Sequence, residues 1–415
     1  MSRRPIALSA LIVCGLLLAP ASARALEHAA DTGTWNVALP GKVFATAQYG
    51  NVMFIGGRFG RVQANPSGSG GAGYPATNLA AIDMTTGQGI ASFAPAVTGN
   101  ANQTAQVHSL AVVGNTLYVG GQFAAVDGHP RYNLAAITID PASMTGTVDP
   151  TFDATVGVPG AANERSTFVY EILPGSAGVY IGGTFAKVDG LARSKTALVR
   201  LDGSLDRIFK TTGVNGAVRD MEFAADGQTI FVGGAFNMIN GASRRSIARI
   251  SPVTGALEPW AIPTSQIEED QTAWDLVVTA TRVYGGLGRG PNYAAAYRVG
   301  SALFDGARVW RYGTSGNVQS IALLGSNDLV IGGHFGTFLE QRVCDNQLLK
   351  NLGILRGVAG ETSPQLDCSF LPQFYGPNEF GGVWEIQVTP AALWTAGEFT
   401  KINDVGYRGI ARFTL

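Results

Sequence analysis

The side chains best suited to chemistry recur at one position, directly after the apolar residue that begins a short β-like run. That position holds aromatic, basic, amide and imidazole groups, namely Phe44, His108, Tyr170, Arg219, Trp274, Gln319 and Trp384. The position after it is often acidic and holds Ala45, Ser109, Glu171, Asp220, Asp275, Ser320 and Glu385. If the runs converge, these side chains form a ring of aromatic platforms and hydrogen-bonding groups, which suits a sugar with its apolar faces and hydroxylated edge.

The same ring also suits catalysis. His108 or Tyr170 would move protons, and Arg219 would neutralise a substrate carboxylate. A general acid/base pair would come from the acids Asp220, Asp275 and Glu385. Clustered carboxylates could instead bind Ca²⁺, but no loop has the spacing of an EF-hand, so neither a metal nor another cofactor is expected.

A structural interpretation stands beside these two. The aromatic members Tyr170, Trp274 and Trp384 would also fit as packing between neighbouring sheets. The repeated acids would then accept hydrogen bonds from one sheet to the next rather than act on a ligand.

A second set of candidates follows a repeated pair of glycines, at Arg58, Gln122, Thr184, Ala235, His334 and Glu398. Two histidines, His108 and His334, thereby fall near the same end of the runs, although a lone histidine is more typical of a structural or surface position. The ligand-binding candidates are therefore Arg58, Trp274, Gln319, His334, Trp384 and Glu398.

The elements that must position these residues form an internal repeat. Its most regular phrase is Tyr118-Val119-Gly120-Gly121, and the second glycine of each copy falls at 57, 121, 183, 234, 286, 333 and 397. Each copy has four short runs separated by Gly, Asn, Asp and Pro, which predicts a four-stranded antiparallel sheet. Such sheets in tandem predict an all-β protein, a β-propeller with its variable loops gathered on one face. A parallel β-helix would need shorter and more constant coils.

The chain ends predict how the ring closes. The last copy stops after its third run at Leu415, whereas the segment 34–40 resembles a fourth run. We therefore expect a seven-bladed propeller in which an N-terminal strand completes the last blade, so that no sheet edge is left open.

One phrase resembles a known repeat. Tyr118-Val119-Gly120-Gly121-x-Phe123-x-x-Val126-Asp127-Gly128-x-x-Arg131-x-x-Leu134-Ala135 is similar to the delta-60 repeat of bacterial secreted β-propellers, and more distantly to the kelch-type blades of Rax2-like proteins. The resemblance covers residues 34–415 and implies the fold. It implies no particular activity, because no single activity belongs to these repeats.

The N-terminus predicts export. Arg3 and Arg4 precede an apolar stretch and the small residues Ala23 and Ala25, which is the pattern of a signal peptide spanning 1–25, followed by a linker at 26–33. Cys344 and Cys368 are the cysteines left after cleavage, and an oxidising compartment favours a disulfide between them.

Composition narrows the partners. Only 14% of residues are charged and the net charge is −1, so nucleic acid is not an expected partner, and no integral membrane segment is expected after signal cleavage. The motif of a nucleophilic serine, a zinc site, a phosphate loop or a dinucleotide fold is not found. We expect a secreted monomer that binds a glycan or protein on its loop-bearing channel face. The alternatives are a secreted polysaccharide lyase or glycoside hydrolase, or an interaction module with a filled channel.

Overall fold

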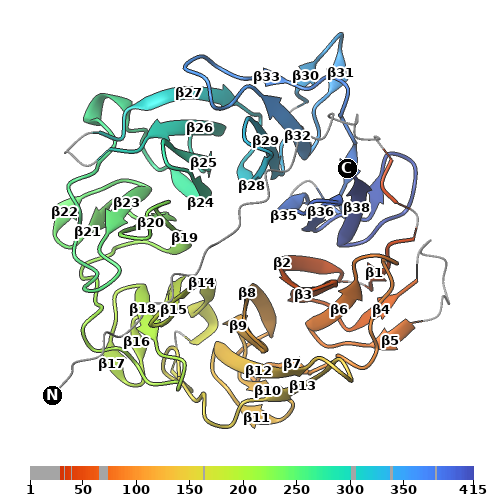
Figure 1. Cartoon of the computed structure of the whole chain (residues 1–415), viewed down its shortest axis with the longest axis vertical. Helices are drawn as coiled ribbons and strands as arrows, with labels where there is room; N and C mark the ends of the chain where they lie inside the picture. Colours follow the sequence, from red (N-terminus) through yellow and green to blue (C-terminus); the bar gives the residue numbers. More distant parts are fainter. Residues whose placement is uncertain are drawn as a thin grey trace, which may run out of the picture.

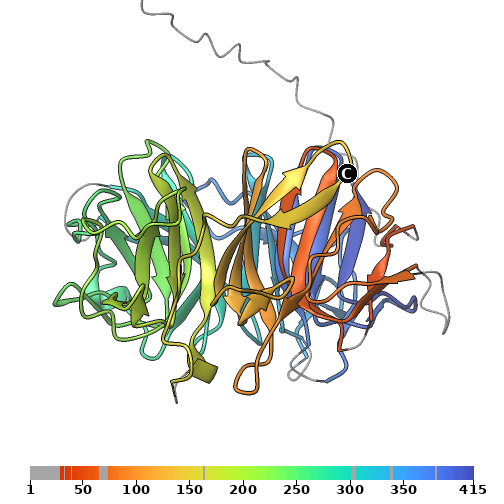
Figure 2. The same cartoon turned by 90° about the horizontal axis from the view of Figure 1, so that it is seen from below.

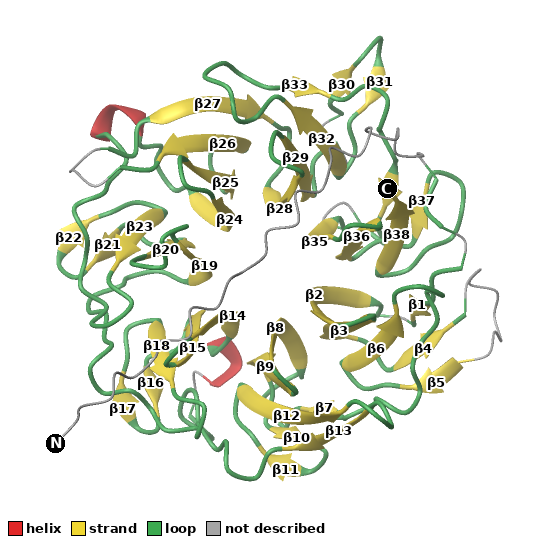
Figure 3. Ribbon diagram, in the orientation of Figure 1, coloured by secondary structure: helices red, strands yellow, loops and turns green. Residues whose placement is uncertain are grey.

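The computed structural model consists of short β-strands. It describes residues 29–31, 33–38, 40–64, 73–161, 164–300, 305–336, 340–378 and 381–415. The predicted signal peptide and most of the predicted linker lie outside these residues. Within them, helix is confined to two 3-10 turns, η1 (Glu164–Ser166) and η2 (Thr264–Gln266) (Figure 3). The all-β class predicted from the sequence is confirmed.

A three-stranded antiparallel sheet recurs along the chain, and its copies stand around a common axis (Figure 1). The strands nearest the axis are β2 (Lys42–Tyr49), β8 (Gln106–Val113), β14 (Val169–Gly175), β19 (Val218–Phe223), β24 (Thr272–Val278), β28 (Val318–Leu324) and β35 (Val383–Val388). The middle strands, which carry the glycine pairs, are β3 (Val52–Arg58), β9 (Thr116–Gln122), β15 (Gly178–Gly183), β20 (Ile230–Gly234), β25 (Arg282–Gly288), β29 (Asp328–Gly333) and β36 (Ala392–Gly397). The third strands are β6 (Leu79–Asp83), β12 (Leu134–Asp140), β18 (Thr196–Val199), β23 (Ile247–Ile250), β26 (Tyr293–Arg298), β32 (Leu352–Arg356) and β38 (Ile410–Thr414).

The expected fourth strand is less regular than the other three. A ladder forms at β13 (Thr145–Val148), β27 (Arg308–Gly313) and β33 (Gln365–Leu366). Elsewhere it is reduced to single bridges such as Val199 with Leu205. In the second copy this strand is β13, which pairs with β12, and Phe152, a few residues later, packs into the core.

Further short strands lie in the loops, outside the repeated sheets. They are β4 (Arg61–Gln63), β5 (Gly73–Pro75), β7 (Val97–Thr98), β10 (Ala125–Val126), β11 (His129–Pro130), β16 (Lys187–Val188), β17 (Leu191–Ala192), β21 (Met238–Ile239), β22 (Ala242–Ser243), β30 (Arg342–Val343), β31 (Gln347–Leu348), β34 (Phe374–Tyr375) and β37 (Lys401–Ile402). Figure 2, at right angles to Figure 1, shows the sheets standing side by side with loops at both of their ends.

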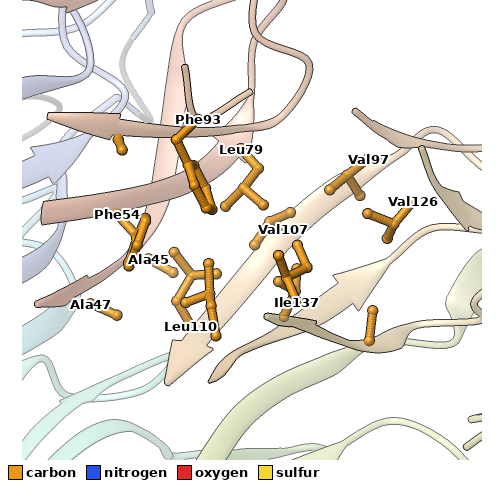
Figure 4. Packing of buried hydrophobic residues seen from close by; sticks show 14 of the residues in the cluster. Ala45, Ala47, Phe54, Leu79, Phe93, Val97, Val107, Leu110, Val126 and Ile137 are labelled. Atoms are coloured by element: carbon orange, nitrogen blue, oxygen red, sulfur yellow. The ribbon is translucent and has the colours of Figure 1, made fainter. Parts of the chain in front are cut away.

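The core lies between the sheets. Buried apolar side chains of one sheet fill the space against the next, as Figure 4 shows for Phe54, Leu79, Val107, Leu110 and Ile137. Each innermost strand packs on the following one, from β2 to β8 and onward to β28 and β35, and β35 also packs on β2. Because apolar burial dominates folding, this packing fixes where the innermost strands meet.

The N-terminal strand differs from the prediction. β1 (Asn36–Val37) forms its ladder with β4 of the first repeat and not with the last sheet. The backbone N–H groups of Asp31 and Val37 nevertheless donate to Arg412 O and Arg408 O in and beside β38, at 2.7 and 3.2 Å. The segment therefore touches the last sheet through scattered hydrogen bonds, because β4 offers it an open strand edge.

The predicted disulfide is present. Cys344 and Cys368 are bonded, with their Cα atoms 5.6 Å apart. The bond joins the β30–β31 loop to the segment that follows β33.

Candidate functional site

Every innermost strand carries a β-bulge at the position that the sequence singled out. The register against the middle strand shifts between Val43 and Ala45, and again between Val218 and Asp220. The same shift occurs in β8, β14, β24, β28 and β35. The unpaired residues are Phe44, His108, Tyr170, Arg219, Trp274, Gln319 and Trp384. A bulge breaks strict alternation, so the residue after it can face the same side.

The glycine pair makes room for this bulge. A Cβ on the second glycine would lie 2.1 Å from Ala217 O at Gly234 and 2.0 Å from Lys42 O at Gly57. A Cβ on the first glycine would strike the next sheet, as at Gly56, where Val107 Cγ1 would be 2.4 Å away. One glycine thus permits the bulge and the other permits the close approach of sheets.

The fifth repeat corrects the sequence alignment. The repeat pattern predicts Gly286 as the second glycine of its pair. In the structure Gly286 pairs with Asp275, which is the place of the first glycine in the other repeats. Leu287, opposite Ala273, occupies the second position. The bulge at Trp274 therefore forms without a glycine opposite it.

The bulged residues and their neighbours surround a cavity of about 260 Å³ at the end of the ring where the innermost strands begin. We call it the mouth cavity. Its lining is Phe44, His108, Tyr170, Glu171, Arg219, Asp220, Trp274, Asp275, Gln319, Trp384 and Glu385. All six residues considered for catalysis, and three of those considered for ligand binding, thus meet at one place.

The other three ligand-binding candidates do not line it. Arg58, the last residue of β3, is exposed. His334 Nδ1 donates a hydrogen bond to Gln319 Oε1, at 2.9 Å, and burial lowers the pKa of this histidine. Glu398 is buried in an ion pair with Lys42, whose Nζ lies 2.8 Å from Glu398 Oε2. His334 therefore holds the lining residue Gln319, whereas Glu398 pairs with Lys42, which lies outside the lining.

Aromatic rings around the mouth cavity stack on one another. Phe44 lies between Trp384 and His108, with ring centroids 5.1 and 4.4 Å away. Tyr170 meets His108 edge-on at 5.2 Å and stacks on Phe168 at 5.1 Å. The faces of these rings are thus largely occupied by each other, as the structural interpretation expects.

The positively charged guanidinium of Arg219 extends this stack of rings. Its guanidinium carbon lies 3.9 Å from the centroid of Tyr170 and 4.6 Å from that of Trp274. Cation–π contacts of this kind hold a guanidinium flat while its N–H edge stays available. Burial lowers the pKa of Arg219, and the nearby positive charge of Arg289 lowers it further.

Several nitrogens in the lining have no hydrogen-bond partner among the described residues. They are His108 Nε2, Arg219 Nε, Trp274 Nε1 and Trp384 Nε1. Buried polar groups in folded proteins are almost always paired, so four residues that line one cavity and each carry a buried, unpaired nitrogen are an unusual group.

The acids, by contrast, join neighbouring sheets. Asp220 Oδ2 accepts the N–H of Leu276 and Asp275 Oδ2 accepts that of Ile321, both at 2.7 Å. Glu385 accepts from Thr46 Oγ1 at 3.0 Å. The repeated acid is therefore a clasp between consecutive innermost strands.

These acids also form the floor of the mouth cavity. Below it lies a second cavity of about 250 Å³, which shares Glu171, Asp220, Asp275 and Glu385 and adds Glu222. We call it the channel cavity. The acids therefore form a layer between the two cavities.

Burial controls the charge of this layer. It raises the pKa of Glu385 to about 8, of Glu222 to about 7 and of Asp275 to about 6. Burial, and then neighbouring carboxylates, raise the pKa of Glu171 and Asp220 well above the usual range. The cause is the cost of removing a charge from water, aggravated by like charges. Burial therefore shifts every acid of this layer toward its protonated, uncharged form.

The histidine of the ring is neutral. Burial lowers the pKa of His108 to about 3, and Arg219 contributes further. An imidazole with such a pKa is a poor proton carrier near neutral pH. The stacking and the pKa together count against the role considered for His108 in catalysis.

Three residues that line or support the two cavities were not predicted from the sequence. Glu222 lies two residues after Asp220 on β19, so strand alternation was the signal that could have found it. Phe168 precedes its strand and packs edge-on against His108 at 5.5 Å. Thr46, two residues after Phe44, holds Glu385, a pairing that only the meeting of first and last sheets reveals.

The described residues contain no group of three or more His, Cys, Asp or Glu side chains arranged to hold a metal ion. Among the same residues, no helix has the length and apolar character needed to span a bilayer.

Comparison with known proteins supports the fold. The profile of a family described as "Domain of unknown function (DUF5122) beta-propeller" matches residues 224–259. The structure of Sqt1 from Chaetomium thermophilum is similar over 89% of this chain and 82% of that one, with 13% identity and a TM-score of 0.51. The radial sheets and these matches agree. The chain has a β-propeller fold.

Two further comparisons add little. The computationally designed Ika8 protein covers 92% of this propeller and 100% of its own chain, with 14% identity and a TM-score of 0.47. No curated protein matches the sequence. The function must therefore be argued from the mouth cavity.

Proposed function

We propose that this chain is a secreted, seven-bladed β-propeller of the delta-60 repeat type that binds a glycan at its mouth cavity. Each blade contributes one bulged side chain to that cavity. The disulfide between Cys344 and Cys368 supports an oxidising compartment, in agreement with the N-terminal sequence pattern.

Contacts between the first and last sheets support a closed ring. Lys42 pairs with Glu398 and Phe44 stacks on Trp384. Tyr407 Oη donates to Ala30 O at 2.6 Å, which ties the N-terminal segment to the last sheet. We propose that residues 30–37 complete this closure, although by scattered hydrogen bonds and not as a full ladder.

One observation carries the binding proposal: four residues with an unpaired nitrogen line a single cavity, and aromatic rings line the same cavity. Sugars offer many oxygen acceptors and apolar ring faces, so they match such a lining. The cavity is slightly smaller than the roughly 300–1,000 Å³ typical of small-molecule sites, which suits one sugar unit at the end of a chain.

The enzymatic alternative has less support. Asp220, Asp275 and Glu385 are engaged as clasps between blades, and His108 stays neutral. The raised pKa of Glu385 is compatible with a general acid, and for that reason hydrolase and lyase products belong in the same assay.

The test is a glycan-binding screen with the purified full-length chain, followed by titration calorimetry. Trp274→Ala and Trp384→Ala should each weaken binding by about tenfold, because each removes a ring and an N–H donor. Tyr49→Phe, at the far end of β2, is the matched control and should bind normally.

No binding to any glycan, or binding indifferent to both tryptophan changes, would contradict the proposal. Reducing ends or unsaturated products that accumulate with the native chain and vanish in Glu385→Gln would favour the enzyme instead.

A further inference from the structure

Among the residues that line the mouth cavity, the unpaired hydrogen-bonding groups are mainly donors. Arg219 Nε, Trp274 Nε1 and Trp384 Nε1 are each bound to a hydrogen and have no partner among the described residues. These groups can only donate hydrogen bonds. Because the three atoms are themselves buried, their side chains must turn toward the cavity for a ligand to pair with them, and that ligand must carry oxygen acceptors.

Arg219 is also an unbalanced charge. No ion pair to it occurs among the described residues; burial and the nearby positive charge of Arg289 lower its pKa, while a hydrogen bond with Tyr170 opposes this shift. Both its faces are covered by the rings of Tyr170 and Trp274. A buried cation without a counter-ion is costly, and a bound anion removes that cost.

Burial favours the uncharged form of most acids in the floor, whereas Asp275 still bears a charge at pH 7. Glu171, Asp220 and Glu385 favour their protonated forms, for which burial is the main cause. A protonated carboxyl group bears no charge and has an O–H donor. Asp275 has the lowest raised value, about 6, and its Oδ2 is engaged with the N–H of Ile321.

We propose that the mouth cavity binds the carboxylate of an acidic sugar, a terminal uronic acid residue, with Arg219 as the group that recognises the carboxylate. Guanidinium and carboxylate are planar and match in a bidentate way, which a neutral hydroxymethyl group cannot reproduce. This inference rests on the glycan-binding function proposed above and specifies its ligand.

Titration calorimetry with four probes tests it: glucuronate, galacturonate, and their neutral counterparts glucose and galactose. Acetate is added as a fifth probe to separate a free carboxylate from a carboxylate carried on a sugar ring. The native chain should bind a uronate at least tenfold more tightly than the neutral sugar of the same configuration and more tightly than acetate, since charge-assisted hydrogen bonds are the stronger ones.

Variants assign the effect to Arg219. Arg219→Gln should weaken uronate binding about 10- to 100-fold and neutral-sugar binding less than about threefold. Arg219→Lys retains the charge without the planar fork and should fall between these limits. Arg207→Gln, at an exposed arginine outside the cavity, is the control and should bind as the native chain does. Circular dichroism establishes that each variant is folded, and Arg219→Lys alone suffices if Arg219→Gln does not fold.

The outcomes separate the two proposals. Equal affinity for uronate and neutral sugar, or a uronate preference that survives in both Arg219 variants, overturns the acidic-sugar inference and leaves glycan binding standing. Acetate that binds as tightly as the uronates also overturns it. If none of the sugars binds, both proposals are overturned.

Discussion

Replacing Gly234 by alanine tests whether the glycine pair builds the site. The added Cβ would lie 2.1 Å from Ala217 O, a backbone atom that cannot swing away as a side chain can. Contacts below 3.0 Å require movement of about 1 Å, so the cost falls near the top of the roughly 1–3 kcal/mol range for overpacking. The lower entropy of an unfolded chain containing alanine offsets about 0.5–1 kcal/mol. The expected net loss is about 2 kcal/mol of unfolding free energy.

The measurement is urea unfolding followed by circular dichroism and tryptophan fluorescence. Gly313→Ala is the matched control, because no heavy atom lies within 4 Å of the added Cβ there. Its stability should stay the same or rise slightly. Gly234 pairs with Val218, immediately before the bulged Arg219, so Gly234→Ala should also weaken ligand binding at the mouth cavity. A Gly234→Ala protein within about 0.5 kcal/mol of native stability would refute the reasoning.

Two further predictions concern the disulfide and the acid floor. Cys344→Ser with Cys368→Ser should lower the unfolding free energy by about 3 kcal/mol in urea titrations, because the bonded cysteines are 24 positions apart in the sequence; no change would show that the loop is already constrained. Folded Glu385 holds its proton up to about pH 8, whereas unfolded glutamate releases it near pH 4.3. Its stabilising contribution is therefore complete below about pH 4 and is lost as the pH rises toward 8. Glu385→Gln should then unfold like the native chain at pH 4 and be more stable by about 1 kcal/mol or more at pH 8, and equal stability at both pH values would contradict this.

The sequence by itself determined the repeat and the residues of the ring. Short alternating runs and recurring turn residues specify strands locally, and the disulfide follows from the presence of only two cysteines after the predicted cleavage site. Equivalent positions in a repeat must reach equivalent places in a stacked array. For this reason the candidates from His108 to Glu385 could be predicted to meet before any coordinates were known.

Only the tertiary structure decided how those residues are used. The bulge after Val218 turns both Arg219 and Asp220 toward the axis, and strict strand alternation could not reveal that. The clasp from Asp220 to Leu276 links residues far apart in sequence, so it exists only once two sheets pack together. The N-terminal strand β1 pairs with β4 and not with the last sheet, because the open edge of β4 can also bind the backbone groups of β1. Local pattern thus specifies strands and their faces, whereas pairing, burial and charge depend on which distant segments come into contact.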